Sequence, residues 1–401
     1  MRVLINRLTA IRQKTGIGHY IDQLLRALPS LACDDDIIVY PGAVAERGMH
    51  AWKCWRRWLG SKATSRAGAS RACASRACAS RARASMHSVG RSFAAWHFRL
   101  FGASRAFDLY HEPNYIPLPC DRPTVATVHD LSVLLRPEWH PADRVAYYER
   151  YFHRAVQQCR HLLAVSEFTR QELIQHLHVP AEKVTCTYNG VRPEMRPLFP
   201  VEYLPVLHRL NLPESYLLYV GTLEPRKNLL LLLRAYCALP EEVRRRCPLV
   251  LVGGWGWSVA KLADFFHREA RHRGVVHLGY VADADLVALY NGARALVFPT
   301  LYEGFGFPAV EMLACGGAVL ASTAGALVEI AGKNACLLDP HDQDAWTRTM
   351  HLAIDDDDWR DVQRRGALAA ARPFTWERCA AQTWQVYRAA LQGQQGLARA
   401  A

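Results

Sequence analysis

Short apolar runs alternate along the chain with longer segments in which apolar residues recur at helical spacing. Strands are expected at residues 3–5, 37–40, 109–111, 124–127 and 162–165, and again at 216–220, 249–252, 275–278, 295–298 and 318–321. Helices are expected at residues 18–28, 144–158, 167–176, 229–239, 284–291 and 308–314. Apolar strands that alternate with helices indicate parallel sheets covered on both faces, which is an α/β fold.

The alternation breaks once, at residues 192–200, where three prolines stand within nine residues. Such a segment continues neither a helix nor a central strand, so we expect a domain linker there. The pattern therefore predicts two doubly wound, Rossmann-like domains, at residues 1–195 and 205–374, that face each other across a cleft. Ligands of such folds bind at the carboxyl ends of the strands.

The length of 401 residues suits two domains of about 150–200 residues each. A last helix, at residues 375–395, carries Trp376, Trp384 and Tyr387 and is expected to pack back on the first domain. No stretch approaches the roughly 18 consecutive apolar residues that span a bilayer, and the N-terminus begins as a buried strand, so we expect a cytoplasmic protein. The twelve cysteines form no C-x-x-C pair, which favours reduced thiols and no structural metal.

Half of the net charge of +12 comes from one segment, because residues 61–85 contain six basic residues and no acidic one. The segment repeats Ala-Ser-Arg-Ala-Cys with a five-residue step, so we interpret residues 60–86 as a low-complexity, poorly ordered insertion. Basic residues also stand beside Trp52, Trp55 and Trp58. This mixture suits the anionic inner membrane or the phosphates of a lipid-linked acceptor; a merely solvated loop is the alternative.

The strongest chemical signal is a pair of carboxylates, Glu303 and Glu311, separated by seven residues and placed directly after an expected strand. Glu303 lies in a loop with two glycines, and Glu311 lies inside the following helix, whose N-terminus attracts anions. Gly304 and Gly306 would let the backbone approach a ligand closely. Glu311 could accept hydrogen bonds from a ribose diol. The alternative of two solvated helix-end residues is disfavoured by the apolar loop around them.

A second signal is the adjacent basic pair Arg226 and Lys227, again between an expected strand and an expected helix. Two cations at the mouth of a cleft can neutralise a diphosphate leaving group. Charge that develops on a departing group is often the main target of catalysis. Adjacent basic residues are usually plain surface charges, and the position after a strand argues against that interpretation here.

Two weaker signals lie in the first domain. Gly16 and Gly18 form a glycine-rich turn before a helix, which is either a structural turn or a cover for a diphosphate. His129 stands at the end of an expected strand, where it could donate a hydrogen bond to a sugar hydroxyl, with Asp130 orienting it. A histidine at a strand end is more often structural, and its expected place at the cleft favours a functional role.

Together these pieces resemble the family 4 retaining glycosyltransferases, which adopt the two-domain GT-B fold. The resemblance rests on the runs Tyr-Val-Gly-Thr-Leu-Glu-Pro-Arg-Lys-Asn at residues 219–228 and Val-Phe-Pro-Thr-Leu-Tyr-Glu-Gly-Phe-Gly-Phe-Pro at 297–308. Two shorter motifs, at residues 164–169 and 188–191, also support the resemblance. The likeness covers most of the chain apart from residues 43–106.

The resemblance implies roles for the matching positions. Glu303 is similar to the first glutamate of the family's E-x7-E motif, near the donor sugar, and Glu311 to the second, on the ribose. The resemblance also implies that Arg226 and Lys227 bind the diphosphate, that the glycine turn of Gly16 and Gly18 faces the phosphates, and that His129 lies near the donor sugar. The backbone of Phe305, Gly306 and Phe307 is expected to contact sugar hydroxyls. Tyr280 and Val281 are expected near the base.

One departure concerns Thr222, another expected donor contact, which stands where many relatives carry an arginine. The chain therefore lacks one residue of the usual two-residue phosphate clamp, and phosphate binding is expected to rely more on Arg226. The subgroup with this motif looks most like bacterial mannosyltransferases of surface-polysaccharide assembly. Guanosine diphosphate mannose is the donor that this analogy implies.

The implied reaction transfers a hexose from a nucleotide-sugar donor to a saccharide or lipid-linked acceptor, without metal or cofactor. The residues alone do not choose between a front-side, leaving-group-assisted displacement and a double displacement; the resemblance favours the former. A uridine diphosphate sugar remains an alternative donor. A nucleotide-sugar epimerase of the same fold and a non-enzymatic basic adaptor for membranes or nucleic acid are alternative functions, and nucleic acid is not expected as a partner of the enzyme.

Overall fold

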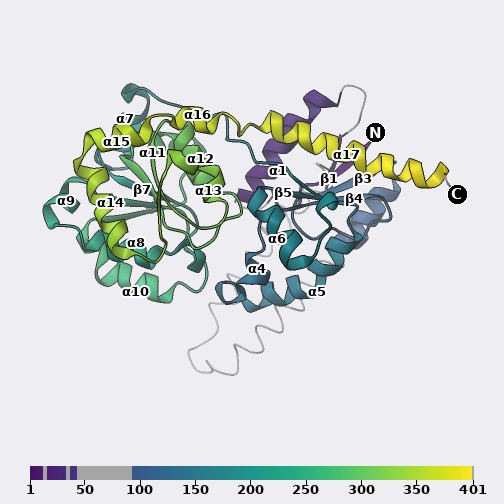
Figure 1. Ribbon diagram of the computed structural model, residues 1–401, viewed down its shortest axis with the longest axis horizontal. Coiled ribbons are helices and arrows are strands. Elements are labelled where there is room, and N and C mark those ends of the chain that lie inside the picture. Colours follow the sequence, from purple (N-terminus) through teal and green to yellow (C-terminus); the bar gives the residue numbers. More distant parts are fainter. Residues whose placement is uncertain (12–15, 33–36, 43–92, 400–401) are drawn as a thin grey trace, which may run out of the picture.

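The computed structural model describes residues 1–11, 16–32, 37–42 and 93–399. The low-complexity segment 60–86 and the three tryptophans before it lie outside the described residues. Figure 1 shows two α/β domains side by side, the second at the left of the view and the first at the right. Within the described residues no helix combines the length and the apolar character needed to cross a membrane.

The first domain is built on a parallel sheet of six strands in the order β2-β1-β3-β4-β5-β6. Its strands are β1 (Val3–Asn6), β2 (Ile37–Tyr40), β3 (Leu109–Glu112), β4 (Thr124–Val128), β5 (His161–Ala164) and β6 (Val184–Cys186). Its labelled helices are α1 (Gly16–Ala27), α4 (Ser132–Leu135), α5 (Ala142–Gln158) and α6 (Glu167–Leu177). The strand order reverses beside β1, which is the switch point of a doubly wound sheet.

The second domain repeats this plan with the order β12-β11-β10-β7-β8-β9, also parallel throughout. Its strands are β7 (Leu217–Val220), β8 (Leu249–Val252), β9 (Val275–Gly279), β10 (Ala295–Phe298), β11 (Ala318–Ser322) and β12 (Cys336–Leu338). Its helices are α7 (Pro200–Arg209), α8 (Leu229–Cys237), α9 (Glu241–Arg246), α10 (Ala260–Arg268), α11 (Asp283–Gly292), α12 (Phe307–Ala314), α13 (Leu327–Ile330), α14 (Gln343–Asp355), α15 (Asp357–Arg364) and α16 (Ala367–Ala371). Here the switch point lies between the neighbours β7 and β10.

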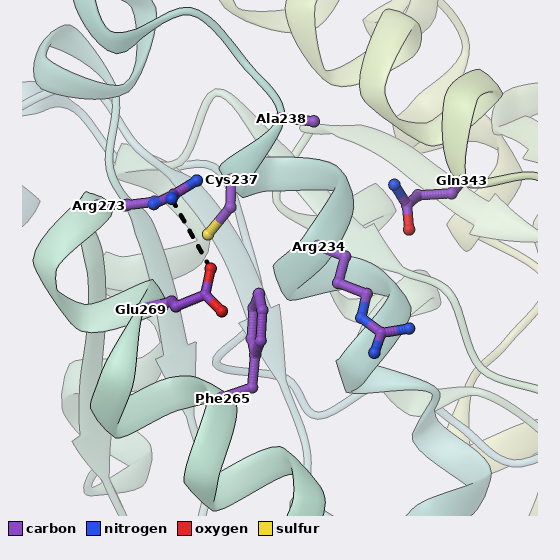
Figure 2. A pocket seen from close by; sticks show the side chains of 7 residues that line it. All are labelled: Arg234, Cys237, Ala238, Phe265, Glu269, Arg273 and Gln343. Carbon is purple, nitrogen blue, oxygen red and sulfur yellow. Dashed lines mark ion pairs between the residues drawn. The ribbon is translucent and has the colours of Figure 1, made fainter.

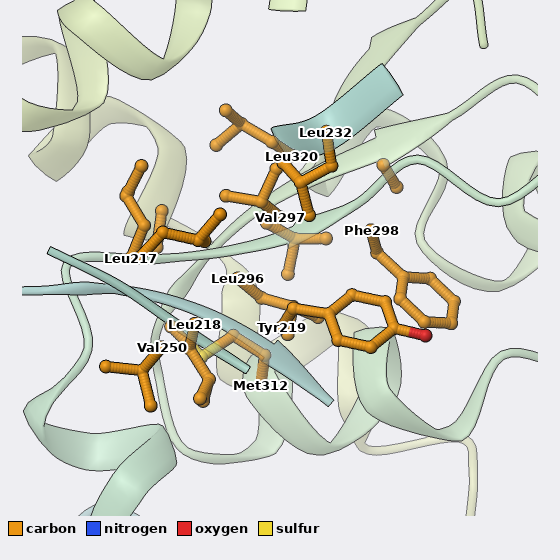
Figure 3. Close-up of a cluster of buried hydrophobic side chains, with 14 of the residues drawn as sticks. Leu217, Leu218, Tyr219, Leu232, Val250, Leu296, Val297, Phe298, Met312 and Leu320 are labelled. Carbon is orange, nitrogen blue, oxygen red and sulfur yellow. The ribbon is translucent and has the colours of Figure 1, made fainter. Parts of the chain in front are cut away.

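The core of the second domain explains why these apolar runs form strands. Leu217, Leu296 and Val250 come from three neighbouring strands and are buried with side chains from the covering helices, among them Leu232 and Met312 (Figure 3). Strands buried on both faces need apolar residues at every position, which is the pattern that the sequence shows.

The α/β fold class expected from the sequence is confirmed. Ten of the twelve strands in the described residues are those expected from apolar runs; the exceptions are the three-residue strands β6 and β12. Both lie at sheet edges and are only three residues long, with every residue except Val184 partly exposed, so they lack a strong apolar signal. The expected linker is irregular up to Phe199, and α7 begins at Pro200, where a proline suits a helix start.

The chain crosses between the domains at two adjacent places. The amide of Val191, at the first crossing, donates to the carbonyl of Phe374, at the second, over 2.9 Å. A Cβ atom added to Gly190 would lie 2.3 Å from the backbone nitrogen of Trp376, so only glycine allows the crossings to lie this close.

The last helix, α17 (Trp376–Arg399), returns to the first domain and lies along α1 (Figure 1). Buried polar groups join it to the sheet. The Tyr387 hydroxyl lies 2.6 Å from His111 Nδ1, and His111 Nε2 lies 2.8 Å from Thr127 Oγ1. Burial, followed by the neighbouring His129, lowers the pKa of His111 to about 3. His111 is therefore a neutral link in a fully buried hydrogen-bonded network.

The His111→Gln variant should lose one source of acid sensitivity. Unfolded histidine binds a proton at its ordinary pKa of about 6.5, whereas folded His111 does so only near 3, so the wild-type free energy of unfolding falls as the pH drops below about 6.5. This group contributes up to about 1.4 kcal/mol per pH unit. Urea unfolding of both proteins at several pH values between neutral and mildly acidic should show the steeper fall in the wild type. Parallel curves would contradict the assignment.

Candidate active site

The expected basic pair and the first glutamate meet at the switch point of the second sheet. β7 leads into the short turn Pro225–Lys227, and its neighbour β10 leads into the loop that carries Glu303. Thr300 Oγ1 donates to the carbonyl oxygen of Arg226 over 3.0 Å, and the amide of Leu301 donates to the same oxygen over 2.7 Å. The two loops are therefore joined at the Arg226 carbonyl, by one backbone and one side-chain hydrogen bond, independently of the ion pairs.

Glu303 is buried between the two cations. Its Oε1 forms an ion pair with Lys227 Nζ, and its Oε2 lies 3.4 Å from Arg226 Nη1. Arg226 Nε donates to Glu224 Oε1 over 2.6 Å, and Arg226 Nη1 donates to the carbonyl of Tyr302 over 3.1 Å. Burial by itself raises the pKa of Glu303, but Lys227 and Arg226 outweigh it and hold that pKa below its ordinary value.

This cluster places two cationic side chains, each paired with a carboxylate, where doubly wound sheets bind ligands. Burial acts to lower the pKa of Arg226, but Glu303 and Glu224 more than offset it, so the guanidinium stays charged. Because neighbouring carboxylates and carbonyls already orient both cations, little side-chain entropy remains to be lost when an anion arrives. The arrangement can stabilise negative charge that develops on a phosphate group.

His129 directly follows β4 of the first domain and is held as a neutral side chain. Its Nε2 lies 2.8 Å from the carbonyl oxygen of Pro113, which can only accept, so Nε2 carries the proton and Nδ1 the lone pair. Burial lowers the pKa of His129 to about 4, although Pro113 and Asp130 act in the opposite direction. The edge of Tyr20 packs against the ring, with centroids 4.9 Å apart. A neutral His129 with this tautomer accepts a hydrogen bond at Nδ1 instead of donating one.

Asp130 does not orient His129, contrary to the expectation from the sequence. Its Oδ1 accepts hydrogen bonds from the Ser132 amide over 3.0 Å and from the Ser132 hydroxyl over 2.8 Å. His140 Nε2 lies 3.0 Å from the same hydroxyl oxygen. The short polar turn after β4 therefore binds the aspartate locally, and the carbonyl of Pro113 holds the histidine instead.

The loop that carries Glu303 also contacts the first domain. The Tyr302 hydroxyl accepts a hydrogen bond from the Leu131 amide over 3.0 Å and donates to Glu172 Oε2. Thr169 Oγ1 donates to the carbonyl of Gly304 over 3.4 Å. Burial raises the pKa of Glu172 to about 7, with the Tyr302 hydrogen bond opposing that shift. The same loop, residues 299–306, thus binds the cations on one side and the facing domain on the other.

Gly304 and Gly306 are required by protein contacts in this structure. A Cβ atom added to Gly304 would lie 1.8 Å from the carbonyl oxygen of His129. Gly306 has a φ of +95°, and an added Cβ would lie 2.5 Å from Leu327 Cδ2. The sequence predicted that these glycines admit a ligand, but the close neighbours observed here are protein atoms. Gly304 meets the first domain, whereas Gly306 meets α13 of its own domain.

The glycine turn of the first domain reaches the same region. Gly16 begins α1, and an added Cβ would lie 3.7 Å from the ring of Phe307 at the start of α12. Gly18 is buried against the backbone of Ala10, at a distance of 3.7 Å for an added Cβ. The rings of Phe305 and Phe307 pack together with centroids 5.1 Å apart, so these side chains contribute to packing.

Glu311 lies one turn into α12 and is almost fully buried. Arg192 Nε donates to its Oε1 over 2.9 Å, and the Tyr290 hydroxyl donates to its Oε2 over 2.8 Å. The side chain is therefore held rigidly, by one residue from the interdomain crossing and one from α11.

The expected contacts to the nucleotide base and to the phosphates differ in exposure. Tyr280 follows β9 and is 58% exposed, whereas Val281 beside it is buried. Thr222 follows β7 and is exposed on the loop that leads to the basic pair. All three stand at the carboxyl ends of strands, as a ligand site in this kind of sheet requires.

A surface hollow on the outer helices of the second domain is separate from this site. Figure 2 shows its lining, which includes Arg234 and Cys237 of α8, Phe265 of α10, and the ion pair between Glu269 and Arg273. None of the residues that line this hollow is among those expected to bind a donor. We assign it no function.

Three residues at the site were not predicted from the sequence. Arg192 follows directly on the Tyr-Asn-Gly-Val motif at residues 188–191, and its buried guanidinium faces Glu311. Tyr302 precedes Glu303, and its partner Glu172 lies on a helix of the other domain. The motif before Arg192 was a usable signal, because a charged residue directly after a recognisable motif could have been proposed as a site residue. The sequence around Glu172 carries no comparable motif.

Comparison with known proteins links both halves of the chain to sugar transfer. The family Glycosyl transferases group 1 matches residues 206–369, and Glycosyltransferase Family 4 matches residues 15–195. The chain is 40% identical over 282 residues to the O-antigen chain mannosyltransferase B of Escherichia coli, covering 70% of this chain and 74% of that protein. It is 30% identical over 278 residues, or 66% of its length, to the serotype-specific mannosyltransferase WbdA of Escherichia coli, of which it spans about a third (34%).

Solved structures with the same two-domain architecture include the sucrose-phosphate synthase of Thermosynechococcus elongatus. It aligns with a TM-score of 0.71 at 17% identity, covering 98% of this chain and 100% of that one. Anabaena HepE in complex with UDP and glucose aligns with a TM-score of 0.67 at 17% identity, covering 97% and 100% of the two chains. These similarities establish the fold and leave the substrate open.

The Gly304→Ala variant should separate the two domains at this loop, because the added methyl group cannot coexist with the His129 carbonyl at 1.8 Å. Amide hydrogen exchange, measured by mass spectrometry, should become faster in peptides that contain Leu131 and the start of α6. Gly254→Ala is the matched control, since an added Cβ there meets nothing within 4 Å. Unchanged exchange at Leu131 in Gly304→Ala would show that the contact does not hold in solution.

Proposed function

We propose that this chain, which belongs to the group 1 glycosyl transferases and carries a Family 4 N-terminal domain, transfers mannose from guanosine diphosphate mannose to a saccharide acceptor in bacterial surface-polysaccharide synthesis. The family, the GT-B fold and the enzymatic class expected from the sequence are confirmed by the family matches and the relatives. Mannose is supported by the names of two relatives, and the guanosine base by the motif analogy alone.

The observation that carries the proposal is the buried cluster of Arg226, Lys227 and Glu303 at the β7/β10 switch point, on a loop whose Gly304 meets the backbone carbonyl of His129. The donor diphosphate would bind Arg226 and Lys227, which stabilise the charge that develops as the sugar–phosphate bond breaks. His129 Nδ1 would accept a hydrogen bond from a hydroxyl of the donor sugar. Glu311 would contact the ribose, and Tyr280 and Val281 the base.

A front-side displacement fits this arrangement best. The acceptor oxygen bonds to the anomeric carbon on the face from which the diphosphate leaves, and the acceptor proton passes to the leaving phosphate. A double displacement would need a carboxylate that is free to attack the anomeric carbon. Glu303 is engaged by two cations, which argues against such a role. The proposal needs no metal or cofactor, because Arg226 and Lys227 supply the positive charge.

We place the enzyme on the cytoplasmic side, in peripheral contact with the anionic inner membrane, where a lipid-linked acceptor would reside. The basic and tryptophan-rich residues before position 86 support this placement through their charge. Among the described residues, Phe93 and Trp96 are 64% and 57% exposed on the helix at residues 93–103. Exposed aromatic residues are suited to a membrane interface. The proposal includes no nucleic-acid partner.

Ligand-induced stabilisation tests the donor. The thermal midpoint of the wild type should rise with guanosine diphosphate and not with uridine or adenosine diphosphate, by about 3 kcal/mol of stabilisation at a hundredfold excess over Kd. Lys227→Met should abolish the rise, because it removes a buried phosphate-binding cation. The control Lys261→Met, at an exposed position on α10, should leave the rise intact.

Transfer should then be measured with guanosine diphosphate mannose and a mannose-containing acceptor, with and without EDTA. Equal rates in both samples are expected. A selective rise with uridine diphosphate would replace the donor and keep the glycosyltransferase. Conversion of the donor sugar without an acceptor would indicate the epimerase. A rise that persists in Lys227→Met would remove the cluster from donor binding.

A further inference from the structure

The side chain of Tyr302 belongs to the second domain but contacts four residues of the first. Its ring lies edge-on to Phe168, with centroids 5.6 Å apart, and its centroid lies 6.4 Å from that of Trp139. Its hydroxyl accepts a hydrogen bond from the Leu131 amide over 3.0 Å and donates to Glu172 Oε2. Tyr302 is only 7% exposed, so these contacts form a buried junction between the domains.

The direction of both hydrogen bonds follows from the protonation of the phenol. Burial, followed by the charges of Asp130 and Glu172, raises the pKa of Tyr302, so the hydroxyl keeps its proton. A phenol has one proton to donate, and here it is directed to Glu172. The lone pairs of the oxygen therefore remain for the Leu131 amide, which can only donate. Glu172 thereby orients the hydroxyl for its contact with the backbone after β4.

The segments that meet at this junction carry residues of the proposed site. Leu131 stands two positions after His129, and Tyr302 directly precedes Glu303. The carbonyl of Tyr302 also accepts a hydrogen bond from Arg226 Nη1 over 3.1 Å. The hydroxyl of Tyr302 thus joins the segment of His129 to the segment of Glu303, while its carbonyl holds Arg226.

We infer that Tyr302 is a positioning residue whose hydroxyl holds His129 in register with the buried cluster around Glu303. The inference rests on the proposed function, in which His129 meets the donor sugar and the cluster meets the diphosphate. Transfer needs both contacts at once, because a misplacement of about 1 Å can lower a rate about a hundredfold. Binding of the nucleoside diphosphate does not need the junction, since its proposed contacts come from the second domain.

The Tyr302→Phe variant separates binding from transfer, because it loses the hydroxyl and keeps both the ring and the carbonyl that holds Arg226. Its Kd for guanosine diphosphate, measured by isothermal titration calorimetry, should stay within about twofold of the wild-type value. The probe of the reaction is guanosine diphosphate mannose at saturation, with water as the acceptor. The rate at which guanosine diphosphate is released from it should fall about tenfold or more.

The Glu172 variants test the same junction from the first domain. Glu172→Leu should slow the release, and Glu172→Gln, which keeps an oxygen that accepts from Tyr302, should restore most of the lost rate. The double variant Tyr302→Phe/Glu172→Leu should be no slower than Tyr302→Phe, because both changes break one junction. The control Tyr216→Phe removes another buried hydroxyl, whose bond to the Leu289 carbonyl lies within the second domain, and should leave the rate unchanged.

Amide hydrogen exchange measures the junction without relying on activity. The Leu131 amide should exchange faster in Tyr302→Phe than in the wild type or in Tyr216→Phe, because its acceptor is lost. Unchanged exchange at Leu131 would overturn the inference. If Tyr302→Phe does not fold, the two Glu172 variants provide the test.

The outcomes separate this inference from the function on which it rests. An unchanged release rate in Tyr302→Phe would overturn the inference. A loss of affinity for guanosine diphosphate equal to the loss of rate would also overturn it, by placing Tyr302 in nucleotide binding. If the wild type neither binds guanosine diphosphate nor releases it from the donor, the proposed function itself fails and the inference falls with it.

Discussion

The pairing of buried opposite charges at the β7/β10 switch point is the condition on which the site depends. A lysine or a glutamate alone in this position would be strongly disfavoured, since an unpaired buried charge costs several kcal/mol. Lys227 and Glu303 come from loops that follow neighbouring parallel strands, so the sheet itself brings them together. Arg226 adds a second cation whose own carboxylate, Glu224, lies in the same turn. The fold thereby holds two positive charges in place without leaving either unpaired.

The loop between β10 and α12 has to satisfy both domains at once. On its own domain it supplies Glu303 to the cations, and across the cleft Tyr302 and Gly304 meet the backbone after β4. This double duty explains why the loop combines a carboxylate, aromatic rings and glycines within a few residues. The Glu303 carboxylate pairs with the cations, and the Tyr302 hydroxyl accepts a hydrogen bond from the Leu131 amide. Gly304 lacks a side chain at the point where the His129 carbonyl comes close.

The parts of this structure that could be predicted are those governed by local pattern and strand order. Apolar runs predicted ten of the strands, and their parallel arrangement placed the candidate ligand-binding residues at the carboxyl ends of strands. That Lys227 and Glu303 meet follows from the adjacency of β7 and β10, which only the structure shows. The edge strands β6 and β12 were missed because three residues, most of them partly exposed, carry almost no periodic signal. Contacts such as Arg192 with Glu311 and Tyr302 with Glu172 join residues more than 100 positions apart, so no spacing rule reveals them. The reason why position 304 requires glycine could not be predicted either, because it depends on how closely the two domains approach each other.

The two adjacent crossings between the domains decide how the halves can move. Because Val191 and Phe374 are hydrogen-bonded to each other, and Gly190 touches the start of α17, both covalent connections pass through one small region. Two rigid bodies tied at a single place rotate about it, and the displacement of any atom grows with its distance from that pivot. Arg192 stands next to this pivot, so a rotation of one half against the other would displace it least. Under the proposed function, the nucleotide site at Glu311 would then keep its geometry while the facing loops farther from the pivot separate.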